Sequence, residues 1–301
     1  MGLGMALNLR KAGHDMVVHD LRKESAEPVL TAGATWADSV AELGAQVDVL
    51  FTSLPGPKEM QALAPGGQDE DGLLATLKPG STWFDLTTNS PTLVKRVAER
   101  CEAHGIRLLD APVSGGPAGA RSGKLAIYVG GDRAVFDQHA KLLDSIGDRV
   151  MHVGPVGAGN TAKLVHNFVS MTVRMALVEG FTVGVKAGLD PMELWHAVRQ
   201  GVIGRSRTFD LLGEEYLTST YEPPKFALRL SHKDFTLALE MARDLNVPLK
   251  LAETAYEDYT AAMERGWGDR DSRVPMELQN ERAGVTVKVT PEAVQQTLAR
   301  G

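Results

Sequence analysis

The sequence is poor in cysteine, in aromatic residues and in positive charge. Cys101 is the only cysteine among 301 residues, so an internal disulfide is excluded and a reducing, cytoplasmic compartment is the simplest expectation. Acidic residues outnumber basic ones by 38 to 32, which gives a formal net charge of −6. The basic residues are scattered along the chain. This argues against a nucleic-acid partner, because phosphate binding requires a concentrated basic surface.

The sequence also lacks the patterns of a metal site and of a membrane protein. Its eight histidines show neither HExxH nor another paired ligand spacing, so we expect no metal. The longest apolar stretch, Phe168 to Val185, is interrupted by Arg174, Glu179 and Gly180. These interruptions favour a buried or interface helix over a membrane span. No secretory signal precedes that stretch.

What the sequence does contain is a change of pattern near its middle. Up to about Val153, short β-rich runs alternate with helical patterns; the runs are residues 16–19, 47–51, 82–86, 107–109 and 125–129. Such alternation predicts a mostly parallel, doubly wound Rossmann-type sheet with crossover helices. Past Gly159 the strand signals nearly vanish. We therefore predict an α/β domain over residues 1–153 and an all-helical domain over residues 154–301, with the boundary between Val153 and Asn160.

Capping residues mark several helix ends. Ser90 before Pro91 predicts the start of a helix that Gly105 closes. Asp190, followed by a proline and then an acid, predicts a second helix start. Thr290, again followed by proline and glutamate, predicts a last short helix.

The N-terminal segment carries the first signal for a dinucleotide. Gly2 leads into a helical pattern, and the strand that follows ends in Asp20. An acid at the end of the second strand of a dinucleotide-binding fold binds the ribose hydroxyls of the adenosine. However, any helix–turn–strand unit can end in aspartate, and Arg22 and Lys23 are placed to meet a 2′-phosphate. The segment therefore predicts NAD or NADP, with NAD favoured.

Two further strand ends carry polar or turn-forming residues. Leu54 and Pro55 follow one predicted strand, and Thr88 follows the next. Ligands of open α/β sheets lie across the carboxyl ends of the strands, which makes these residues candidates for cofactor binding. Threonine, asparagine and serine before a proline are equally well explained as ordinary helix capping.

A glycine-rich segment, residues 110–125, follows the fourth run. Ser114, Gly115 and Gly116 in it can present a hydroxyl and backbone N–H groups to a carboxylate. This predicts a small acidic substrate. A tight loop between two strands is the alternative, and it explains two glycines readily but the segment's four poorly.

Lys163 and Asn167 are the strongest candidates for catalysis. They lie four residues apart in an apolar helical pattern, so both side chains lie on one face of a helix. If Asn160 caps this helix, Lys163 lies in its first turn, where the helix dipole lowers the pKa of the ammonium toward that of a general base. The alternative is a surface lysine after a glycine loop. Similarly, Lys233 beside Asp234 is usually a solvated helix start.

Taken in order, these segments resemble the β-hydroxyacid dehydrogenase family, which includes 3-hydroxyisobutyrate dehydrogenase and tartronate semialdehyde reductase. The resemblance covers almost the entire chain and rests on four motifs: residues 1–9, residues 110–116, the Lys163–Asn167 spacing and the Lys233–Asp234 pair. It implies an NAD(P)-dependent enzyme that oxidises a small 3-hydroxy acid or reduces the corresponding semialdehyde.

The resemblance also implies a role for each motif. Lys163 would exchange a proton with the substrate hydroxyl, and Asn167 would orient both groups. Ser114, Gly115 and Gly116 would hold the substrate carboxylate. The cofactor-binding residues would be Gly2, Asp20, Leu54, Pro55, Thr88 and Lys233. A homodimer or homotetramer is expected, since the apolar helix that follows Lys163 cannot face water on every side.

The chain departs from the family pattern in two places. If Met1 and Gly2 are the end of the glycine fingerprint, the family's first strand and first two glycines have no counterpart. We then expect the natural chain to begin upstream and this chain to bind dinucleotide weakly. His166 stands where many relatives carry a second asparagine. A non-catalytic nucleotide-binding protein on the same fold remains an alternative that the missing fingerprint favours and Lys163 opposes. Imine reduction is opposed by the same lysine.

Overall fold

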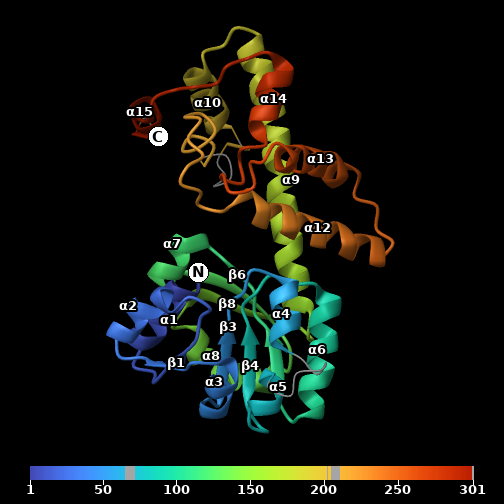
Figure 1. Cartoon of the computed structure of the whole chain (residues 1–301). Coiled ribbons are helices and arrows are strands. Elements are labelled where there is room, and N and C mark those ends of the chain that lie inside the picture. Colours follow the sequence, from blue (N-terminus) through green and yellow to red (C-terminus); the bar gives the residue numbers. More distant parts are fainter. Residues whose placement is uncertain (65–71, 202, 205–210, 300–301) are drawn as a thin grey trace. The chain divides into compact units, whose positions relative to one another are not determined.

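The chain divides into an α/β unit, Met1–Leu164, and a helical unit, Val165–Gly301, here called unit 1 and unit 2 (Figure 1). The structure is a computed structural model that describes residues 1–64, 72–201, 203–204 and 211–299. The predicted Rossmann-type domain followed by a helical domain is confirmed. Unit 1 ends later than the predicted boundary, because the first turns of a long helix are hydrogen-bonded to it.

Unit 1 contains a six-stranded mixed sheet and a separate two-stranded sheet. The strands are β1 (Val17–Val18), β2 (Thr35–Trp36), β3 (Val49–Thr52), β4 (Thr82–Asp85), β5 (Arg107–Asp110), β6 (Val113–Ser114), β7 (Leu125–Gly130) and β8 (Gly147–Gly154). The larger sheet has the order β3-β4-β5-β7-β6, and β8 also pairs with β7. Strands β3, β4 and β5 are parallel, as predicted. Strand β7 runs antiparallel to β5 and β6, which the sequence did not indicate.

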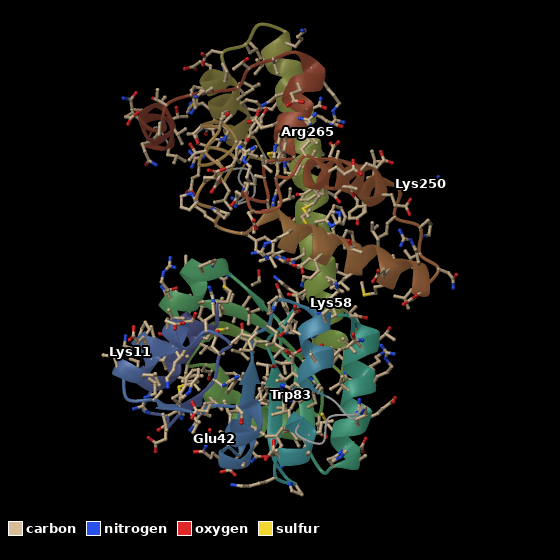
Figure 2. The ribbon with its side chains drawn as sticks, viewed as in Figure 1. Lys11, Glu42, Lys58, Trp83, Lys250 and Arg265 are labelled. Carbon is tan, nitrogen blue, oxygen red and sulfur yellow. The ribbon has the colours of Figure 1, made fainter. Side chains whose placement is uncertain are left out.

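Helices cover both faces of this sheet (Figure 1). On one face lie α4 (Pro57–Leu63), α5 (Leu73–Thr76) and α6 (Pro91–Ala103), and on the other lie α1 (Gly2–Lys11), α7 (Gly116–Ser122) and α8 (Arg133–Leu143). Side chains alternate between the two layers: Trp83 and Leu108 point into the first, whereas Phe84 and Leu109 point into the second. Trp83 is fully buried (Figure 2). The alternation follows from the two-residue period of a strand.

The remaining helices of unit 1 lie near the smaller sheet, which consists of the parallel pair β1 and β2. They are η1 (Lys23–Ala26), α2 (Glu27–Thr31) and α3 (Val40–Gln46). Within the described residues, the two sheets share no strand pairing.

The predicted helix starts are confirmed. The Ser90 hydroxyl accepts a hydrogen bond from the Leu93 amide at 3.4 Å, and Gly105, with a φ of 70°, follows the end of α6. Asp190 accepts bonds from two amides in the first turn of α10 (Pro191–Gln200). The Thr290 hydroxyl accepts one from Ala293 at the start of α15 (Pro291–Ala299).

Unit 2 is built from helices around an aromatic core. Besides α10 and α15 it contains most of α9 (Ala158–Lys186), together with α12 (Leu228–Asp244), α13 (Lys250–Glu264) and α14 (Met276–Ala283). The rings of Phe235 and Tyr259 meet edge to face, with centroids 5.4 Å apart, where α12 packs on α13. Phe181 of α9 meets Tyr216 in the same way. Such edge contacts suit the quadrupoles of the rings.

Helix α9 is unusually long and apolar. It is the one described helix that has the length and composition to cross a membrane, and 28% of its most apolar window is buried. On its buried side, Met171, Met175, Val178 and Phe181 belong to the core of unit 2. Three valines of the same helix, Val165, Val169 and Val183, are nevertheless exposed.

Candidate active site

Several predicted cofactor residues lie where helices and strands of unit 1 end. Gly2 begins α1, and a Cβ added there would lie 3.7 Å from Cβ of Ser53, just past the end of β3. The next residues, Leu54 and Pro55, form the start of the loop after β3. The Leu54 amide donates a 3.0 Å hydrogen bond to the hydroxyl of Thr87, past the end of β4. The structure thus brings the α1 start, the β3 loop and the β4 loop together.

Thr87 was not singled out from the sequence, although its neighbour Thr88 was. The Thr87 side chain is buried, whereas Thr88 is half-buried. Thr87 joins the loop after β4 to the loop after β3 through this hydrogen bond, and it thereby helps to fix the position of the adjacent Thr88. The signal in the sequence is the two-residue step from Asp85 to Thr87, which puts both on the same side of the chain.

The start of α1 suits a dinucleotide pyrophosphate. Met1 occupies the N-cap position, and in the described part of the chain no side chain caps the amides of the first turn. A ten-residue helix with such a start attracts a negatively charged group. A glycine at the first position leaves room for that group to approach the backbone.

Asp20 lies exposed after β1, and its Oδ1 accepts a 2.9 Å hydrogen bond from the Arg22 amide. The ammonium of Lys23, the residue that we had considered for a 2′-phosphate, lies 5.1 Å from the centroid of the Trp36 ring. This cation–π contact holds Lys23 against β2. Asp20 itself is exposed, two residues past the end of β1.

The Ser114 segment has the backbone that only glycine adopts readily. Ser114 ends β6, and the φ angles of Gly115 and Gly116 are 134° and 62°. In the described part of the chain, a Cβ added at Gly116 would meet no atom within 4 Å. Gly116 is thus required by the backbone conformation and lies beside open space, as a backbone that receives a ligand would.

Lys163 is buried, with 8% of its surface exposed, in the second turn of α9. The prediction that Asn160 caps this helix is wrong, because α9 already begins at Ala158. The amides that a cap would satisfy are bonded instead by Asp110, at the end of β5. Lys163 therefore lies beyond the first turn, to which the effect of the helix dipole is mostly confined.

Two buried carboxyls lie near this helix start. Asp110 accepts hydrogen bonds from the amides of Gly157 and Asn160, both at 2.7 Å. Burial raises its pKa to about 6, although these bonds favour the ionised form. Burial also raises the pKa of Asp85, which accepts bonds from the Thr52 hydroxyl and the Asn89 amide group.

Asn167 follows Lys163 by one turn of α9, at the beginning of unit 2. Its Nδ2 donates a 2.6 Å hydrogen bond to Oδ2 of Asp234, and Oδ1 of Asp234 lies 2.8 Å from Nζ of Lys233. The buried Asp234 thus joins the two predicted site residues of unit 2. The sequence contains only a weak signal for this role, which is the position of Asp234 next to Lys233.

The remaining predictions concern His166 and metal ions. His166 lies exposed on α9, between the two candidate catalytic residues. In residues 1–64, 72–201, 203–204 and 211–299, no group of three or more histidine, cysteine, aspartate or glutamate side chains is arranged to hold a metal ion.

Comparison with known proteins shows the family to which the chain belongs. The family described as the NAD binding domain of 6-phosphogluconate dehydrogenase matches residues 1–154, and that described as NAD-binding of NADP-dependent 3-hydroxyisobutyrate dehydrogenase matches residues 157–278. The chain belongs to the β-hydroxyacid dehydrogenase family. Members of this family are NAD(P)-dependent hydroxyacid dehydrogenases and semialdehyde reductases, so the chain is an oxidoreductase of this kind.

Individual relatives match over nearly their full length. A 2-(hydroxymethyl)glutarate dehydrogenase of Eubacterium barkeri is 33% identical, and the match covers 95% of this chain and 94% of that protein. A 3-hydroxyisobutyrate dehydrogenase of Pseudomonas aeruginosa is 34% identical, with 85% and 86% covered. The solved 3-hydroxyisobutyrate dehydrogenase of Mycobacterium tuberculosis, 27% identical, matches with a TM-score of 0.81 over 93% of this chain and 95% of that one.

Proposed function

We propose that this protein transfers a hydride between a nicotinamide cofactor and a small 3-hydroxy acid or its semialdehyde, with Lys163 as the acid/base. The observation that carries the proposal is the burial of Lys163 on α9, one turn before Asn167. Burial opposes the charge of a lysine, and a lysine that gives up its proton readily is suited to acid/base chemistry. In a family of dehydrogenases, proton exchange with a substrate hydroxyl is the function that a lysine performs best.

In the oxidative direction Lys163 would accept the hydroxyl proton, and in the reductive direction it would return the proton. Asn167 would orient the substrate hydroxyl with which Lys163 exchanges this proton. Its Nδ2 is directed to Asp234, so its Oδ1 points the other way, where it can accept a hydrogen bond from a hydroxyl or an ammonium. The Asp234–Lys233 ion pair fixes that orientation.

The bound nicotinamide would supply the hydride chemistry. Gly2 at the start of α1 would receive the pyrophosphate, and Asp20 would accept hydrogen bonds from the adenosine ribose. Leu54, Pro55 and Thr88 would line the nicotinamide side of the site, and Lys233 would contact the cofactor from unit 2. We propose NAD over NADP, because Asp20 would repel a 2′-phosphate and Lys23 is held on Trp36.

The substrate would be a small carboxylate. Two relatives are named for 2-(hydroxymethyl)glutarate and 3-hydroxyisobutyrate, both of which carry a hydroxyl on the carbon β to a carboxyl group. In this chain Ser114 and the backbone of Gly115 and Gly116 would hold that carboxylate. Neutral analogues, such as methyl esters, should then be poor substrates.

The exposed part of α9 supports a homo-oligomer, which we propose to be a dimer or tetramer of a cytoplasmic protein. Five small or apolar residues form one stripe along the helix: Val165, Val169, Ala176, Gly180 and Val183. Their spacing of three, four or seven residues keeps them on one face, and the three valines are 43–70% exposed. A second copy of the chain that covered this stripe would remove it from water. Sedimentation of Val169→Glu should show a smaller species than the wild type, whereas Leu21→Glu in unit 1 should not change it.

The function is tested by assaying a panel of 3-hydroxy acids and semialdehydes with NAD and NADP, for the wild type and Lys163→Ala. The variant should lose about 10²–10⁴-fold in kcat with little change in the Kd of the cofactor. Lys186→Ala, at the other end of α9, is the matched control and should retain full activity. If Lys163→Ala remains within a few-fold of the wild type, Lys163 is not the acid/base. Binding of NADH without turnover of any substrate would instead support a non-catalytic nucleotide-binding protein.

A further inference from the structure

Asp110 lies at the point where α9 begins, although it belongs to a strand. It is the last residue of β5, and its side chain is fully buried. Its Oδ1 accepts the Gly157 amide at 2.7 Å, and its Oδ2 accepts both the amide and the side-chain Nδ2 of Asn160, at 2.7 and 3.2 Å. Both oxygens of one carboxylate thus satisfy N–H groups that the helix start would otherwise leave without partners.

Two glycines bring the helix start close enough for this contact. A Cβ at Gly159 would lie 2.3 Å from the carbonyl oxygen of Tyr128 and 2.5 Å from that of Asp110. A Cβ at Gly130 would lie 2.5 Å from Oδ1 of Asp110 and 2.7 Å from the Gly159 amide. Real Cβ atoms do not tolerate such distances, so the backbone of α9 lies directly on β5 and β7. Any side chain at either position would move the helix.

A second anchor continues from Asn160 to the neighbouring strand. Oδ1 of Asn160 accepts a 2.6 Å hydrogen bond from the Asn89 amide, and Nδ2 of Asn89 donates to Asp85 at 3.1 Å. Asp85 ends β4 and also accepts the Thr52 hydroxyl at 2.8 Å. The ends of β3, β4 and β5 are therefore joined to α9 by one buried chain of hydrogen bonds, with Asn160 as the link.

We propose that Asp110 is a positioning residue, which fixes the first turn of α9 on the sheet and thereby places Lys163 for proton transfer. Lys163 follows Gly157 by six residues and Asn160 by three, and an α-helix transmits a shift of its first turn along its axis without absorbing it. The carboxylate bonds the amides of Gly157 and Asn160 and the Asn160 side chain, so it acts through the position of the helix. This proposal rests on the proposed role of Lys163.

The ionisation of Asp110 is compatible with this role. Burial raises the pKa of the carboxyl to about 6, so that it is ionised at neutral pH. An ionised carboxylate accepts all three N–H groups, and charge-assisted bonds of this kind are stronger than neutral ones. An amide in the same place would turn an NH₂ group toward one of these donors.

The test is Asp110→Asn, which keeps the shape of the side chain. We expect kcat to fall by about 10–100-fold, because a displacement of the order of 1 Å has that effect on a positioned catalytic group. The Kd of NADH, measured by titration calorimetry, should stay within about twofold. Amide hydrogen exchange of residues 157–164 should become faster. A merely structural role would instead lower the melting temperature and leave kcat per folded molecule unchanged, and that result would overturn the proposal.

A matched control and a milder variant complete the experiment. Asp132→Asn alters the aspartate whose side chain accepts the Val135 amide at the start of α8, at an exposed site in the same unit, and should leave kcat unchanged. If Asp110→Asn fails to fold, Asn160→Ala removes one of the three bonds and the link to Asn89, and should lower kcat by a smaller factor. Unchanged kcat in Asn160→Ala with faster exchange would also overturn the proposal. Failure of the proposed function is recognised separately, by an active Lys163→Ala, whereas the exchange rates of residues 157–164 report the fixing of the helix start whatever the role of Lys163.

Discussion

The two units bury acidic side chains in different surroundings. In unit 1, Asp85 and Asp110 accept hydrogen bonds from amides and a hydroxyl, all of them uncharged donors. In unit 2, Asp271 and Glu215 lie against the guanidinium of Arg273, at 2.9 and 3.1 Å, and Glu215 also lies 2.7 Å from the Lys225 ammonium. Among the carboxyls that the structure describes, Asp85, Asp110 and Glu215 have their pKa raised by burial.

The difference lies in what each arrangement fixes. Asp110 bonds two backbone amides, so it determines where the start of α9 lies. Asp271 of unit 2 also accepts backbone amides, but it has a guanidinium beside it. Ion pairs join side chains, so Arg273 links the segment around Glu215 to the segment around Asp271 within unit 2. The comparison therefore predicts a stability role for the ion pairs of unit 2 and a geometric role for the hydrogen bonds of unit 1.

The largest expected effect on stability is that of Arg273→Ala. The Arg273 side chain is 11% exposed, and its removal leaves Asp271 buried without its cation and Glu215 with Lys225 only. Loss of one partner from a buried pair costs about 3–5 kcal/mol, because the remaining charge is uncompensated. Urea unfolding followed by circular dichroism measures this loss.

The control is Arg265→Ala (Arg265 is labelled in Figure 2). Its pair with Glu281, at 2.8 Å, has exposed fractions of 44% and 52%. An exposed pair contributes about 0–1 kcal/mol. Equal losses of unfolding free energy in the two variants would mean that the buried ion pairs of unit 2 have no special role in stability.

The next prediction is the contribution of Asp110 to the pH dependence of stability, which Asp110→Asn isolates from that of the other buried acids. Burial raises the pKa of Asp110 from 3.8 to about 6, so the folded state binds its proton more tightly than the unfolded state. The associated stability is present below about pH 4 and is lost as the pH rises through about 6, by up to roughly 3 kcal/mol for a shift of about two units. The raised pKa of Asp85 acts in the same direction. Urea unfolding at several pH values between 4 and 7 should show a shallower slope for Asp110→Asn, and parallel curves would contradict this assignment.

The same contrast explains what the sequence could predict. Local signals predicted five strands, the caps at Ser90 and Asp190, and a helix with Lys163 and Asn167 on one face. They missed β2 and β6, which have two residues each, and β8, whose residues are mostly half-buried or exposed. Bonds across long separations could not be predicted: Asp110 is 50 residues from Asn160, and Asp234 is 67 residues from Asn167. The wrong cap at Asn160 has this cause, because local spacing does not show that a distant carboxylate satisfies the helix start.

Alanine substitution of two glycines on α9, Gly159 and Gly180, tests whether the start of this helix packs directly on the sheet of unit 1. Gly159→Ala places a Cβ 2.3 Å from a backbone oxygen that cannot move freely, which should destabilise the protein by about 1–3 kcal/mol. Gly180→Ala lies on the same helix, where in the described part of the chain an added Cβ meets no atom within 4 Å. In the Val169→Glu background, in which the proposed interface between copies is broken, it should stabilise by up to about 1 kcal/mol, since alanine favours helix over glycine. Losses of the same size at both positions would indicate that α9 is not seated on β5 and β7.

The smallest expected effect on stability concerns Asp190 in unit 2. Like Asp110, this aspartate accepts backbone amides at the start of a helix, but it does so at the surface. Asp190 accepts the amides of Met192 and Glu193, at 2.8 and 3.1 Å, at the exposed start of α10. Asp190→Ala should cost about 1 kcal/mol, the usual loss of an N-cap, because water can replace the carboxylate at an exposed helix end. At Asp110 water has no access, so Asp110→Ala should cost more and should also lower kcat, whereas Asp190→Ala should leave kcat unchanged. Thermal unfolding and steady-state kinetics of both variants decide this, and equal effects would mean that burial adds nothing to the cap on α9.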